Sequence, residues 1–107
     1  MDMGSMMKQA QQMQSEMKKM QEELKNEIIT TGAGRGAVVV SINGEMEIKT
    51  LAIDPKLAPM NDTEKLSELI KFAVNDAVSK SKDTAAKKMS RLAGGLNIPG
   101  LSGLMGR

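Results

Sequence analysis

The most constraining feature of this 107-residue chain is a narrow stripe of apolar residues near its start. This spacing, with intervals that alternate between three and four residues, is typical of a helix that packs against another helix. The stripe consists of Met3, Met6, Ala10, Met13, Met17, Met20 and Leu24. The positions between them are mostly Gln, Lys, Glu and Ser, so the rest of this helix is expected to face water.

The stripe must be covered by the rest of the chain or by a second copy, because a single helix cannot hide it. Methionine is a flexible side chain that fills irregular gaps, so an adaptable groove for several partners is the alternative interpretation. We expect a helix-packing or dimer surface made of Met6, Ala10, Met13, Met17, Met20 and Leu24.

Composition favours a small, soluble domain that self-associates. The chain has room for one domain, and its only aromatic residue is Phe72, so its core buries little area per residue. Cysteine is absent, which suits the cytosol and excludes a disulfide framework. No apolar run approaches the roughly 20 residues that span a bilayer. The N-terminus also lacks the layout of a signal peptide. We therefore expect a cytoplasmic protein without a membrane partner.

Charge is unevenly distributed along the chain, although the net charge is only +2. Residues 1–78 hold nine basic and twelve acidic side chains, whereas residues 79–107 hold six basic side chains against Asp83 alone. The basic end is a candidate site for phosphates or another polyanion. A solvated helix face is the alternative interpretation of the same residues.

The first half of the chain predicts a helix over residues 5–26 and then three short strands up to residue 53. The strand-like runs are separated by a glycine-rich loop at residues 32–36 and by Asn43-Gly44. Asn-Gly between two such runs predicts a hairpin with a type I′ turn. The apolar positions change parity near Thr50, which predicts a β-bulge, and Asp54-Pro55 ends the last strand.

A second helix is predicted to begin near Asn61-Asp62, where either residue can be the cap and Glu64 stands three residues after Asn61 as in a capping box. It is predicted to run to Leu92, before Gly94-Gly95. Its first half carries an apolar face, which we expect to pack on the sheet: Leu66, Leu69, Ile70, Ala73 and Ala77. In the second half this sector becomes basic and the apolar cluster moves about 110° around the helix. The second half is therefore expected to project further and to turn a basic face outward. A break around residues 79–83 is the competing explanation. We expect a single domain over residues 1–93 and a flexible tail over residues 94–107.

Catalysis has little support in the residue set. The chain has no His and no Cys, which removes the commonest general base, the best thiol nucleophile and most zinc chemistry. Asp54 and Asp76 are isolated carboxylates, for which structural roles suffice. Residues 32–37 match G-x-G-x-x-A, but Val38–Val40 follow where a dinucleotide site needs a helix. We expect no enzyme activity, no metal or other cofactor and no small-molecule substrate.

Four segments in the same order resemble the YbaB/EbfC family of nucleoid-associated proteins: MKQAQQMQ at 7–14, ING at 42–44, IDPKL at 53–57 and VNDA at 74–77. The resemblance covers residues 5–96. It implies an α+β fold with an N-terminal helix, a three-stranded antiparallel sheet and a long C-terminal helix, assembled as a homodimer with protruding helices. It also implies binding to double-stranded DNA in the bacterial nucleoid, with effects on compaction or gene expression. The matching segments lie at structural joints, so they assign no DNA contacts.

Candidate DNA contacts follow from charge and position. Two basic ends of a dimer would straddle a duplex and bind mainly phosphates, with low sequence specificity. The proposed contacts are Lys80, Lys82, Lys87, Lys88 and Arg91, with Lys8, Lys18 and Lys19 on the first helix as secondary candidates. The alternative function is a non-catalytic protein-interaction adaptor or chaperone-like dimer, which the exposed methionine stripe and the apolar tail would serve.

Overall fold

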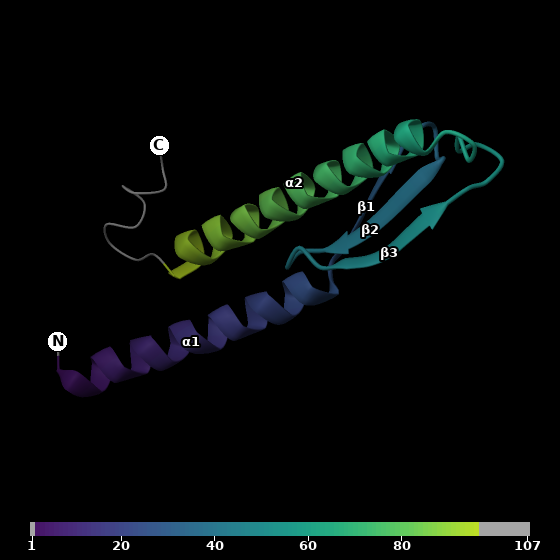
Figure 1. Ribbon diagram of the computed structural model, residues 1–107. Coiled ribbons are helices and arrows are strands. Elements are labelled where there is room, and N and C mark those ends of the chain that lie inside the picture. Colours follow the sequence, from purple (N-terminus) through teal and green to yellow (C-terminus); the bar gives the residue numbers. More distant parts are fainter. Residues whose placement is uncertain (1, 97–107) are drawn as a thin grey trace.

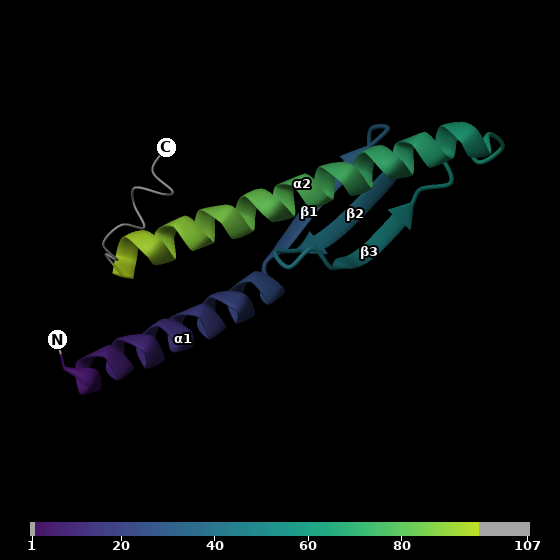
Figure 2. The same ribbon diagram turned by 60° about the vertical axis from the view of Figure 1, so that its left-hand side comes forward.

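The computed structural model describes residues 2–96. Helix α1 (Met3–Asn26) leads into strands β1 (Ile28–Ala33), β2 (Val38–Asn43) and β3 (Ile48–Ile53), and helix α2 (Thr63–Leu96) follows. The strands form one antiparallel sheet in the order β1-β2-β3, so the predicted α+β architecture is confirmed. The fold is elongated, with a radius of gyration of 19.5 Å, whereas a compact domain of this size has one of about 13 Å. Figures 1 and 2 show α1 and the second half of α2 extending past the same end of the sheet.

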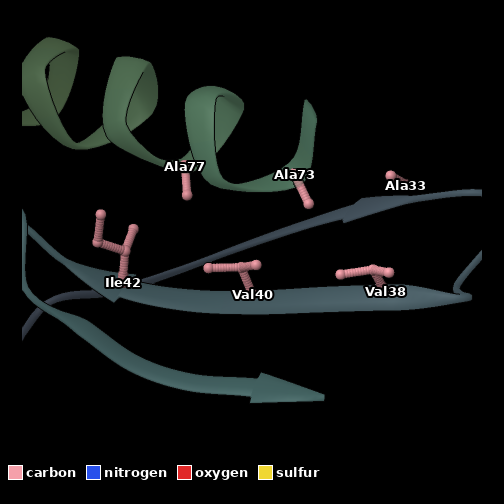
Figure 3. Packing of buried hydrophobic residues seen from close by; sticks show 6 residues of the cluster. All are labelled: Ala33, Val38, Val40, Ile42, Ala73 and Ala77. Atoms are coloured by element: carbon pink, nitrogen blue, oxygen red, sulfur yellow. The ribbon is translucent and has the colours of Figure 1, made fainter. Parts of the chain in front are cut away.

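The core lies between α2 and one face of the sheet. Pairing of Ala33 with Val38 and of Thr31 with Val40 places alternate residues of both strands on the helix side. The buried cluster consists of Ala33, Val38, Val40, Ile42, Ala73 and Ala77 (Figure 3). Two alanines on the helix let it approach the β-branched side chains of β2 closely.

The predicted sheet-facing side of α2 is confirmed. Leu66, Leu69 and Ile70 are partly buried against the core, and Ala73 and Ala77 are completely buried. A hydrogen bond of 2.8 Å from Thr31 Oγ1 to the carbonyl oxygen of Ala73 also joins β1 to the helix. The first half of α2 is therefore the part that belongs to the sheet.

The type I′ turn lies in the first strand connection, and the prediction at Asn43-Gly44 was wrong. Arg35 and Gly36 have φ of 58° and 94°, and the amide of Ala37 donates to the carbonyl of Gly34. These φ values match the two central positions of a type I′ turn. The second connection spans three residues between Asn43 and Glu47, and there Met46 adopts the positive φ of 63°.

Asn43 is the last residue of β2, and its side chain organises this second turn. Its Oδ1 accepts hydrogen bonds from the amides of Glu45 and Glu47, and its Nδ2 donates to Glu47 Oε1 and to the carbonyl of Lys25. A fully buried asparagine that makes four hydrogen bonds is well satisfied. Sequence reasoning located the hairpin correctly but assigned the wrong role to the asparagine.

The predicted bulge near Thr50 is confirmed on β3. Ser41 pairs with Thr50, whereas the next residue, Ile42, pairs with Ile48, so Lys49 is the extra residue. The shift keeps Ile48, Leu51 and Ile53 on the helix side of the sheet despite their uneven spacing.

Helix α2 begins after Asp62, whose Oδ1 accepts a hydrogen bond from the amide of Lys65. Of the two predicted caps, the structure shows Asp62, so Asn61 and Glu64 form no capping box. The helix is continuous through residues 79–83, as predicted, which excludes the competing explanation of a break there. At about 1.5 Å per residue it is about 50 Å long. It also passes through Gly94 and Gly95 to Leu96, where the sequence predicted its end. The predicted tail at 94–107 lies outside the described residues from position 97 onward.

Candidate nucleic-acid interface

The candidate interface is formed by two helical arms, which we define as α1 and the part of α2 from residue 79 to residue 96. Both arms lie beyond the sheet in Figures 1 and 2, and they contact each other. Between them is a groove of about 240 Å³, lined by Glu16, Lys19, Met20, Glu23, Lys88, Arg91 and Leu92. Its lining is mainly charged, and Met20 and Leu92 are the apolar residues in it. Such a surface suits a polar, charged ligand better than an apolar one.

A buried polar junction fixes the directions of both arms relative to the sheet. Ser81 Oγ donates a hydrogen bond of 2.7 Å to the carbonyl of Asn43 and accepts one of 3.0 Å from the amide of Met46. On the other side, Asn43 Nδ2 donates to the carbonyl of Lys25 at the end of α1. The hairpin after β2 therefore connects the end of α1 to the middle of α2. Sequence reasoning missed this role of Ser81, because a single serine in a long helix carries no signal of burial.

Glu47 belongs to the same junction. The hydrogen bond from Asn43 lowers the pKa of the Glu47 carboxyl from its ordinary value, and the nearby charge of Lys49 adds to this effect. The folded turn therefore favours the charged carboxylate form of Glu47.

The basic residues of the α2 arm do not form one cluster. At about 100° per residue, Lys80, Lys87 and Arg91 lie within about 40° of one another and form a stripe along the helix. All three are exposed. Arg91 also lines the groove, so this exposed stripe borders α1. Lys82 is exposed about 160° around the helix from Lys80, on another face.

Two of the predicted contacts already have partners within the chain. Lys80 Nζ lies 3.1 Å from Asp76 Oδ2, in an exposed pair one helical turn apart. Lys88 Nζ lies 3.3 Å from Glu23 Oε2 and 3.6 Å from Glu27 Oε2, so it joins the two arms. Its side chain is only 20% exposed, which distinguishes it from the residues of the stripe.

The secondary candidates on α1 are all exposed. Lys8 and Lys19 lie within about 20° of each other on the helix, whereas Lys18 lies about 100° away from Lys19. Residues 2–27 hold five acidic side chains against four basic ones, so α1 is not a basic arm. The positive charge of the interface is concentrated on α2.

Only the end of the predicted packing stripe on α1 is covered within the chain. Met20 and Leu24 are buried, whereas Met6 is 58%, Met13 36% and Met17 37% exposed, and Ala10 is also exposed. The covered pair lies where α1 meets the hairpin and α2.

A second exposed apolar row lies on β3. Ile48 and Leu51 lie on the helix side of the sheet, yet they are 45% and 42% exposed, and Ile53 is only partly buried. The cause is the position of α2, which lies over β1 and β2. Sequence reasoning missed this row, because the parity of a strand does not tell which part of a sheet a helix covers.

Among residues 2–96 there is no group of three or more His, Cys, Asp or Glu side chains that could hold a metal ion. No helix in that range is long and apolar enough to cross a membrane.

Comparisons with known proteins agree with this arrangement of arms and sheet. The sequence model of the YbaB/EbfC DNA-binding family matches residues 1–96. A protein of Desulforamulus reducens named nucleoid-associated protein is 49% identical over 94% of this chain and 95% of its own length. A protein of the same name from Pelotomaculum thermopropionicum is 45% identical with the same coverage of both chains.

A solved structure has the same fold. It is the crystal structure of an uncharacterized protein from Helicobacter pylori, which is 27% identical and superposes with a TM-score of 0.78 over 86% of this chain and 97% of that one.

Proposed function

Because the chain belongs to the YbaB/EbfC DNA-binding family, we propose that it is a nucleoid-associated protein that binds double-stranded DNA as a homodimer, with low sequence specificity. It would act in the cytoplasm at the nucleoid, and effects on nucleoid organisation and gene expression would follow from the binding. Catalysis has no part in this function.

The observation that carries the proposal is the basic stripe of Lys80, Lys87 and Arg91 on the α2 arm. From its first to its last residue the stripe is about 16 Å long, at 1.5 Å per residue. Along the duplex axis, this length corresponds to about five phosphates of one strand. Release of counterions from these phosphates is the main source of affinity for such a surface.

Low sequence specificity is supported by the side chains around this stripe. Between residues 76 and 94 there is no Asn or Gln to pair with adenine, and Arg91 is the only residue with a planar guanidinium that matches the acceptors of guanine. Serine, threonine and lysine in this region are better suited to phosphate oxygens. The interface is therefore expected to fix position on the duplex without reading its sequence.

The homodimer is supported by the apolar surface that one chain leaves uncovered. It comprises the outer part of the α1 stripe, with Met6, Met13 and Met17, and the β3 row of Ile48, Leu51 and Ile53. On the α2 arm, Met89 is 39% exposed and adds to it. Exposed apolar residues in this number are typical of an interaction site, and a second copy would also double the basic stripe.

The test is binding of a random-sequence duplex by the purified protein at about 50 and 200 mM salt, with the mass in solution measured in parallel. Counterion release predicts a steep loss of affinity between the two salt concentrations. The homodimer predicts a mass of twice the 11.5 kDa of one chain. Absence of binding at both salt concentrations would favour the adaptor function, which the exposed methionines of α1 would serve. A mass of one chain at high protein concentration would contradict the homodimer.

A further inference from the structure

Lys88 differs from the other basic residues of the α2 arm in its surroundings. At about 100° per residue it lies about 100° around the helix from Lys87, on the side that faces α1. Its ammonium group lies within 4 Å of two carboxylates, those of Glu23 and Glu27, which are one helical turn apart at the end of α1. No other lysine of residues 2–96 is paired with two carboxylates from a different helix.

The two carboxylates need a cation at this position. Glu23 and Glu27 lie at the C-terminal end of α1, where the partial negative charge of the helix disfavours further negative charge. Glu27 Oε2 is buried and accepts no hydrogen bond, so its nearest compensation is the Lys88 ammonium at 3.6 Å. The Lys88 ammonium from α2 offsets both the repulsion between the carboxylates and the end of α1 and the missing hydrogen bond of Glu27 Oε2.

We propose that Glu23 and Glu27 compete with DNA phosphates for Lys88, so that Lys88 holds the two arms together and does not contact DNA while these carboxylates are present. This inference rests on the proposed DNA-binding function. The α1 arm thereby lowers the number of phosphates that the α2 arm can neutralise. Glu23 and Glu27 have side chains that are 51% and 42% exposed, so the site is open to solvent and a phosphate could reach Lys88 once the two charges are removed.

The experiment measures the dependence of duplex binding on salt concentration for the wild type and four variants of the full chain. In Glu23→Gln/Glu27→Gln, Lys88 becomes free to bind a phosphate, and the slope of log K against log salt should steepen by about 0.9 per chain. The matched control is Glu45→Gln/Glu68→Gln, which removes the same charge at two exposed positions without touching the groove or the partners of Lys88. The affinity of this control for the duplex should rise, because the protein repels the phosphates less. Its slope of log K against log salt should equal that of the wild type.

The third variant, Lys88→Gln, keeps most of the aliphatic side chain. Its slope should equal that of the wild type, because the residue it removes does not contact DNA, whereas Lys87→Ala should flatten the slope by about 0.9 per chain. The proposal would be overturned if Lys88→Gln flattened the slope as Lys87→Ala does, or if Glu23→Gln/Glu27→Gln gave the slope of its control.

A failure of the DNA-binding function itself would give a different result. In that case the wild type would not bind the duplex, or Lys87→Ala would leave the slope unchanged. Thermal unfolding of each variant, monitored by circular dichroism, verifies that the measured chains are folded.

Discussion

The amide of Gly44 donates a hydrogen bond of 2.8 Å to the carbonyl of Leu24, which ties the β2–β3 hairpin to the end of α1. The approach is so close that a Cβ atom at position 44 would lie 2.7 Å from Leu24 Cδ2 and 2.9 Å from the Leu24 carbonyl oxygen. The φ of Gly44 is not in the left-handed region, so backbone conformation does not require glycine here. The close contact with α1 does.

The first prediction concerns this contact. Gly44→Ala should destabilise the fold by about 1–3 kcal/mol, because backbone atoms of α1 would have to move to admit the methyl group. Gly4→Ala is the control, since its Cβ would meet nothing closer than 3.8 Å and alanine favours a helix. Urea unfolding compares the two variants. Equal stabilities would show that α1 does not pack on Gly44.

The second prediction concerns the buried hydroxyl in the middle of α2. Ser81→Ala should cost about 1–3 kcal/mol, because the buried hydroxyl makes two hydrogen bonds, one to the carbonyl of Asn43 and one from the amide of Met46. Without it, the Met46 amide keeps only its longer bond of 3.3 Å to the carbonyl of Asn43. Ser79→Ala, at an exposed position of the same helix, should change stability by less than about 0.5 kcal/mol. Thermal denaturation of both variants measures the difference, and a neutral Ser81→Ala would exclude the hydrogen-bonded junction.

A third prediction addresses the uncovered row on β3. Leu51→Glu places a charge in the surface that we assign to the dimer, whereas Thr50→Glu places the same charge on the opposite face of the same strand. Light scattering at micromolar concentration should show a mass near that of one chain for Leu51→Glu and an unchanged dimer for Thr50→Glu. If both variants remained dimeric, the β3 row would lie outside the interface.

The fourth prediction is a loss of stability in acid. Because the pKa of Glu47 is lower in the folded chain than in the unfolded chain, the charged carboxylate stabilises the fold at pH values above the unfolded pKa. This contribution is lost as the pH falls through the folded pKa. Glu47→Gln removes the titrating group, so its stability should depend less on pH in the acidic range. Urea titrations between about pH 3 and 6 would contradict this assignment if the two proteins lost stability in parallel.

Much of this fold could be predicted from the periodicity of the sequence. The methionine stripe, the three strands, the bulge near Thr50 and the sheet-facing side of α2 all follow from the spacing of apolar residues. Local signals were less reliable at the turns and helix ends. Asn43-Gly44 carries the usual mark of a type I′ turn, but tertiary contacts of both residues determine the conformation there.

The candidate site was harder to predict, because it depends on which residues of two helices face each other. Charge alone grouped Lys82 and Lys88 with Lys87. Lys82 lies on another face of α2, and Lys88 pairs with two carboxylates of α1. The glutamates at the end of α1 gave no sign that they approach α2, since 65 residues separate Glu23 from Lys88.

The central claim is that the stripe on the α2 arm contacts DNA phosphates, and the salt dependence of binding tests it most directly. Duplex affinity is measured between about 50 and 200 mM salt for the wild type, for Lys87→Ala/Arg91→Ala and for the control Lys65→Ala/Lys71→Ala, which removes two exposed lysines from the sheet half of α2. The stripe variant should bind more weakly at every salt concentration, with a slope shallower by about 3 to 4 per dimer. A slope equal to that of the wild type, or the same loss in the control, would contradict the assignment.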